Sequence, residues 1–276
     1  MRAHVKSLAA AAAFLAGAAL APERAVASAS FDATYGIYVA GLPIGEADVT
    51  STFDGRRYAI EVQARLVGLA GVFIDGRGAA TASGQVEGER IAPTSFAVVS
   101  STSRASRTVR MGMRGGSVAA VEILPPLEEY PDRVPVRNAD RRGIVDPVSA
   151  FVFPARGRLP ADDPRQCERT IPVFDGASRF DIALSYGGTR RFEKPGFSGD
   201  VLICRARFRA ISGHRPDREA LRFMEANEDM AVWLAPVEGS RSLFPMRIEV
   251  RTQIGMSVIE AANVTFGGTA RHTSAR

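Results

Sequence analysis

The chain has 276 residues, of which 46% are hydrophobic, 24% charged and 8% aromatic, with a formal net charge of +5 at pH 7. This composition is too apolar for a disordered chain and too mixed for a fibrous protein. Only Lys6 and Lys194 are lysines, so arginine carries nearly all the positive charge. A GC-rich genome explains this bias, and guanidinium groups also suit phosphate and carboxylate ligands.

Residues 1–27 have the three parts of a secretory signal peptide. A basic start precedes an uninterrupted run of small or apolar residues at 8–21, and small-x-small sites end at Ala27 and Ala29. The run spans about 21 Å as a helix, less than the ~30 Å hydrocarbon core of a membrane. We therefore expect cleavage after Ala27 or Ala29 and delivery of a soluble protein to the periplasm. The alternative is a buried N-terminal helix. An exported protein has little access to nucleic acid, so we expect no such partner.

Apolar and polar residues alternate with period two over much of the first half of the mature chain, which is typical of half-buried β-strands. The Asp54-Gly55 dipeptide between two such runs predicts a hairpin turn. The expected strands are 31–39, 47–53, 58–66, 77–85, 93–102, 106–113 and 117–123.

Residues 125–143 break this alternation with four prolines and many charges, which indicates a surface connection. Asp146 followed by Pro147 predicts the start of a short helix, with the Asp146 side chain as N-cap. A second short helix is expected within 216–227. The remaining expected strands are 170–174, 179–186, 200–211, 229–235, 244–253 and 257–266.

The pattern predicts a mainly β protein, built on a single curved antiparallel sheet of roughly twelve strands with two short helical insertions. The domain should cover 28–266 and be followed by a flexible tail at 267–276. Alternation excludes a parallel sheet that is buried on both faces. A two-sheet sandwich remains an alternative, whereas frequent arginines and a single tryptophan disfavour an outer-membrane barrel.

Cys167 and Cys204 are the two cysteines of the chain. In an oxidising compartment an isolated pair most simply forms a disulfide. A metal pair or a redox dithiol lacks C-x-x-C spacing and nearby histidines. Because no cysteine precedes Cys167, the leader offers no residue for lipid attachment.

No catalytic motif emerges from the sequence. Only His214 and His272 remain after processing, too few for a metal site, and no G-x-S-x-G surrounds a serine. Asp175 and Asp181 could be paired as acids for glycoside cleavage, but Asp175 is better explained by its turn. We therefore predict no enzyme activity, no cofactor and no metal.

One apolar segment, 68–74, lies where a polar loop is expected, so it should cover something hydrophobic. It could line a pocket, close an open barrel, meet a partner or simply complete the core. A binding site for a lipid or other amphiphile would then combine an apolar wall, this segment and rim arginines. The predicted site residues are Tyr35, Ile37, Val39, Tyr58, Ile60, Val62, Leu69, Phe73, Arg179, Arg215 and Arg247.

Five segments together resemble an exported Gram-negative family of unknown function, domain-of-unknown-function family 3108. They are 35–47, 145–150, 173–181, 211–216 (with Cys204) and 244–247, and the resemblance extends over about 31–266. It implies an exported, disulfide-containing β protein with no established activity. It also implies an open or spiral β-barrel, similar to lipoprotein-localisation factors, although such a likeness does not establish function.

The leading hypothesis is a periplasmic envelope protein that binds an amphiphile on its concave face. The alternative is a non-catalytic structural or assembly factor of the envelope that contacts protein or peptidoglycan.

Overall fold

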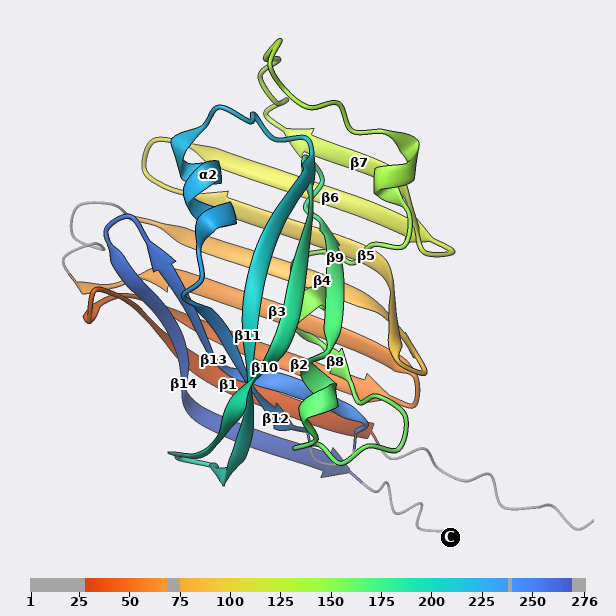
Figure 1. Cartoon of the computed structure of the whole chain (residues 1–276), viewed down its shortest axis with the longest axis vertical. Helices are drawn as coiled ribbons and strands as arrows, with labels where there is room; N and C mark the ends of the chain where they lie inside the picture. Colours follow the sequence, from red (N-terminus) through yellow and green to blue (C-terminus); the bar gives the residue numbers. More distant parts are fainter. Residues whose placement is uncertain (1–27, 69–74, 238–239, 270–276) are drawn as a thin grey trace, which may run out of the picture.

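A computed structural model of the chain describes residues 28–68, 75–237 and 240–269. Its strands form one antiparallel sheet (Figure 1). The strands of the first half are β1 (Ser28–Val39), β2 (Leu42–Asp54), β3 (Arg57–Leu66), β4 (Arg77–Glu87), β5 (Arg90–Ser101), β6 (Ser106–Arg114) and β7 (Ser117–Leu124). Those of the second half are β8 (Phe153–Pro154), β9 (Arg169–Phe174), β10 (Arg179–Lys194), β11 (Phe197–Ser212), β12 (Met230–Pro236), β13 (Ser242–Thr252) and β14 (Gly255–Thr269).

Strand order explains how one sheet can enclose an interior. The order is β7-β6-β5-β4-β3-β2-β1-β14-β13-β12-β11-β10-β9, with β8 paired to β13. The first and last strands of the chain therefore pair at the centre, and two meanders extend from them in opposite directions. In Figure 1 strands β9 to β11 cross in front of the strands of the first half. The prediction of a single, mainly antiparallel β sheet is confirmed, and the described residues form 14 strands rather than roughly twelve.

Helical structure is sparse. The expected insertion at 216–227 contains the helix α2 (Glu219–Ala226). The segment that begins at Asp146 contains only the 3-10 turn η2 (Ser149–Phe151), and further 3-10 turns are η1 (Asn138–Arg141) and η3 (Pro164–Cys167). Within the described ranges no helix is long and apolar enough to cross a membrane.

The alternation read from the sequence corresponds to burial. Along β2 exposed and buried residues alternate from Ala47 to Phe53. The predicted Asp54-Gly55 turn is present, and Gly55 adopts the positive φ of 60° that this tight connection requires. The last strand is longer than expected, because 267–269 pair with the start of β1. These three residues belong to the sheet and not to a tail.

A large core joins the two meanders. Phe31 on β1 is fully buried, and its ring centroid lies 4.4 Å from that of Phe244 on β13. The Tyr35 hydroxyl donates a 2.6 Å hydrogen bond to the carbonyl of Pro245 across the small residue Ala261 of β14. The inner face of the first strands is therefore covered by the protein's own side chains.

The second core cluster surrounds the disulfide. Cys167 at the end of η3 is bonded to Cys204 on β11, with the two Cα atoms 5.3 Å apart. Both cysteines are fully buried, and Leu202 and Leu234 lie in the same cluster. The predicted disulfide is present, and it fixes η3 to the sheet.

The sheet is not closed into a barrel by strand pairing. Its two end strands, β7 and β9, are instead joined by residues 142–145, which bridge Ser117 on one side and Val173 on the other. The amide of Val145 donates to the carbonyl of Pro172 at 2.8 Å. This short connector spans only part of the gap between the sheet edges, and a cavity lies beside it.

Candidate functional site

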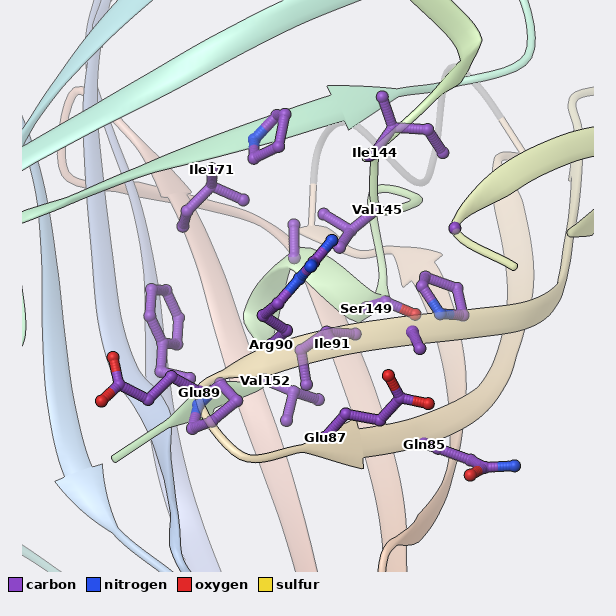
Figure 2. Close-up of a pocket in the computed structure, with 18 of the residues that line it drawn as sticks. Gln85, Glu87, Glu89, Arg90, Ile91, Ile144, Val145, Ser149, Val152 and Ile171 are labelled. Carbon is purple, nitrogen blue, oxygen red and sulfur yellow. The ribbon is translucent and has the colours of Figure 1, made fainter. Parts of the chain in front are cut away.

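The cavity has a volume of about 740 Å³. It lies between the start of β5, the β6–β7 turn, the segment 143–156 and the start of β9 (Figure 2). Pairing explains its position. Strand β5 pairs with β6 only from Ser95 onward, so its first residues have no neighbour on that side. On the outer side of β9, the described residues form a single bridge, between Val145 and Val173. The volume is in the range typical of small-molecule sites.

Aliphatic side chains form one part of the lining. Ile144, Val145 and Val152 come from the connector and the turn that follows it, and all three are buried. Ile91 on β5 and Ile171 on β9 are half-buried and lie on opposite sides of the cavity in Figure 2. These five residues give the cavity an apolar surface suited to a hydrocarbon chain.

Charged side chains of both signs form another part of the lining, and Glu87, Glu89 and Glu168 lie there together with three arginines. Arg90, Arg156 and Arg169 all line the cavity. In Figure 2 the side chain of Arg90, an exposed residue, extends from β5 toward Val145. Arg156 lies within 3.6 Å of Glu89, whereas Arg90 and Arg169 have no carboxylate within 4.0 Å among the described residues. The cavity therefore contains two guanidinium groups without an acidic partner.

Arg169 is the more constrained of these two. Its Nε donates to the carbonyl of Gln166 at 2.9 Å, and its Nη1 to that of Pro154 at 3.0 Å. Burial lowers the pKa of this guanidinium to about 10, with a further lowering from the nearby Arg156 and a partial opposing effect of Glu89. The group remains charged at neutral pH, and the charge is held in place without a counter-ion.

A buried polar network lies behind the cavity wall. The hydroxyls of Tyr58 on β3 and Ser149 on η2 are 2.7 Å apart, and Ser149 also lines the cavity. Asp146 Oδ1 accepts hydrogen bonds from the amides of Val148, at 3.0 Å, and Ser149, at 2.9 Å. Its Oδ2 has no partner within the described part of the chain. Burial raises the pKa of Asp146 despite these bonds.

The residues predicted as an apolar wall do not line this cavity. Tyr35, Tyr58 and Ile60 are buried in the main core, and Val62 packs against it. Val39, near the end of β1, is half-buried.

Ile37 lines a different hollow of about 460 Å³ at the opposite end of the strands. Leu69 and Phe73 lie outside the described residues, so their predicted role in closing one end stays a prediction.

The three predicted rim arginines are engaged elsewhere. Arg179 pairs with Asp181, and Arg247 pairs with both Glu249 and Glu260.

Arg215 contacts Asp132 at 2.9 Å and stacks on the ring of Tyr130, beside another hollow of about 400 Å³. The sequence did not single out Arg90, Arg156 or Arg169. Each lies at the start of a strand or in a connection, and nothing in its local pattern indicates that the three meet.

No group of three or more His, Cys, Asp or Glu side chains suited to a metal is found in the ranges that the structure describes.

Sequence comparison assigns the chain to a family. Residues 30–261 match the family described as "Protein of unknown function (DUF3108)", and the chain belongs to it. No curated protein matches the chain.

Two solved structures are similar in outline. One is a "Beta-barrel-like Protein of Domain of Unknown Function DUF1849 from Brucella abortus", with 10% identity and a TM-score of 0.46, covering 89% of this chain and 99% of that one. The other is described as "a putative lipoprotein from Parabacteroides distasonis", with 9% identity and a TM-score of 0.38, covering 86% and 95%.

Proposed function

We propose that this protein is a non-catalytic periplasmic binding protein whose cavity between β5 and β9 takes an anionic amphiphile. The observation that carries the proposal is the Arg169 guanidinium, which lines the cavity, belongs to a half-buried residue and has no carboxylate within 4.0 Å among the described residues. Isolated buried charge is costly unless a counter-charge compensates it. A bound carboxylate or phosphate would supply that counter-charge.

The aliphatic residues make a free inorganic anion a poorer match than an amphiphile. Ile91 and Ile171 face the cavity from two strands, and Val152 lies beneath them. Each buried methylene of a hydrocarbon chain contributes about 0.8 kcal/mol. A ligand with both an acidic head and an apolar tail would therefore use the whole lining.

Two features support the periplasmic part of the proposal. The leader at 1–27 has the order of a cleavable signal peptide, and the disulfide between Cys167 and Cys204 is typical of an oxidising compartment.

The alternative is a structural or assembly factor of the envelope that contacts protein or peptidoglycan through its surface. One observation favours it: the inner face of the first strands is covered by the protein's own core, as Phe31 and Tyr35 show. A protein that only needs rigidity would bury this face in the same way.

The first experiment asks whether the cavity holds lipid. The mature protein is purified from the periplasm without detergent, and extracted ligands are identified by mass spectrometry. Affinity for a fluorescent fatty acid is then measured for the wild type, Arg90→Gln and the matched control Arg104→Gln. Arg104 lies in the β5–β6 turn, at the other end of β5, and has no ion pair among the described residues.

We expect Arg90→Gln to weaken binding about tenfold and Arg104→Gln to leave it unchanged, because Arg90 lines the cavity and Arg104 does not. Ligand-free protein that also ignores the fatty acid would refute the proposal and favour the structural role.

A further inference from the structure

The cavity does not end at Arg156. Two further hollows, of about 230 Å³ and 610 Å³, continue from it along the same end of the sheet. Glu89 borders all three spaces, Arg156 and Glu168 border the first two, and Arg158 borders the last two. We call the two additional hollows the side groove. Because neighbouring spaces share these residues, the side groove adjoins the cavity.

The side groove is rich in arginine. Arg56, Arg158 and Arg241 line its larger hollow, and none of them has a carboxylate within 4.0 Å among the described residues. Arg165 lines its smaller hollow but is paired with Asp163 at 2.7 Å. The groove therefore has three guanidinium groups that no acidic side chain of the described chain neutralises.

Of the two acidic residues at the junction, Glu89 already has partners within the protein. Glu89 Oε1 accepts a 2.8 Å hydrogen bond from the amide of Gly157, and its Oε2 lies 3.6 Å from Arg156. Arg156 Nη1 also donates to the carbonyls of Arg165, at 3.0 Å, and Glu168, at 2.6 Å. Glu168 also borders the junction and has no basic side chain within 4.0 Å among the described residues, so a carboxylate lies between two separate groups of unpaired arginines.

Two arginines of the groove are the most available to a ligand. Arg241 donates through Nη2 to the carbonyl of Gly157 and is partly committed to the loop. Arg56 and Arg158 make no side-chain hydrogen bond within the described residues, and both are exposed. The carbonyl of Arg56 accepts from the amide of Val86 at 2.6 Å, so the backbone that presents this side chain is anchored to β4.

From this arrangement we infer that the side groove selects an amphiphile whose head carries a second, separate anionic group. The inference rests on the proposed function, since the first anionic group would occupy the cavity beside Arg90 and Arg169. The second group would lie between Arg56 and Arg158. The ligand class is a lipid with two phosphates or carboxylates on a polar spacer such as a sugar. A simple fatty acid would leave the groove unused.

The test uses two probes that differ by one phosphate. Lysophosphatidylinositol and lysophosphatidylinositol 4-phosphate share one acyl chain and one inositol ring, so any difference in affinity reports the second phosphate. Both are titrated into the mature protein by calorimetry, below their micellar concentrations. The variant is Arg56→Gln/Arg158→Gln, and the matched control is Arg104→Gln/Arg107→Gln, which removes the same charge away from the cavity and the side groove.

We expect the wild type to bind the second probe about tenfold more tightly than the first, and the groove variant to lose this preference. Its affinity for the first probe should stay within about twofold of wild type, and the control pair should keep the preference. Thermal unfolding of each variant checks that the fold is intact.

Two different failures can be distinguished. Equal wild-type affinity for the two probes, or an equal loss of both in the groove variant, would overturn the inference while leaving the cavity proposal standing. If neither probe binds the wild type, the proposed function fails and the inference falls with it.

Discussion

The inner face of the first strands and the gap between the sheet edges differ in what their apolar side chains contact. On the inner face, Phe31 packs against Phe244, and Tyr35 reaches Pro245, so side chains from the other meander cover the surface. At the gap, the start of β5 has no partner on the β6 side and β9 is an end strand of the sheet, and Ile91 and Ile171 face a cavity. Hence an alternating apolar strand can face either core or empty space, and strand pairing decides which.

The largest effect is expected from a substitution in the packed core. Phe31→Ala should lower the free energy of unfolding by about 3–5 kcal/mol, because it removes a fully buried ring and leaves a hole among Phe244 and Phe266. Ile91→Ala at the cavity should cost less, below about 2 kcal/mol, since its side chain already borders empty space. Urea denaturation of both variants measures the difference. Similar losses would contradict the contrast between the two regions.

The next effect concerns the disulfide, which holds η3 against the sheet near Arg169. Cys167→Ser and Cys204→Ser should each lower stability by about 3 kcal/mol, because the bond closes a loop of 37 residues in the unfolded chain.

The double Cys variant should be no less stable than either single one in thermal or urea unfolding. Unequal single losses, or two free thiols in protein taken from the periplasm, would show that the bond is absent in the cell.

The smallest effect is expected from the titration of Asp146, behind the cavity wall. Burial raises the pKa of Asp146 above its ordinary value of 3.8, so the folded protein binds a proton there more readily than the unfolded chain. The contribution of Asp146 to the free energy of unfolding must therefore fall as pH rises from about 4 toward neutrality. Asp146→Asn keeps an oxygen acceptor for the amides of Val148 and Ser149 but cannot titrate.

Stability measured by urea denaturation between pH 4 and pH 7 should consequently decline less steeply with pH in Asp146→Asn than in the wild type. Parallel pH profiles for the two proteins would show that Asp146 has the same proton affinity in both states.

Much of the fold could be predicted from the chain because its cues are local. Period-two alternation identified most strands, Asp54-Gly55 identified a hairpin, and the isolated pair of cysteines identified the disulfide. Asp146 accepts hydrogen bonds from the amides of Val148 and Ser149, but the N-cap of the turn η2 is Val148 and the turn is too short to be an α-helix. The two-residue strand β8 was missed because it is too short for any periodic pattern.

The candidate site could not be predicted, because nothing local distinguishes its residues. Tyr58 and Ile60 follow the same alternation as any lining residue, yet they lie in the core. Arg179 and Arg247 resemble free arginines in the sequence, but each has an acidic partner in the structure.

Sequence alone determined the β class and which strand residues are buried, since each depends on neighbours within a few positions. Tertiary structure alone decided that the start of β5 and the end strand β9 would lie on either side of a cavity and that Arg90, Arg156 and Arg169 would line it. These three arginines come from segments up to 79 residues apart, counted from Arg90 to Arg169. Such distant charges come together because the sheet curves and residues 142–145 bridge its end strands β7 and β9.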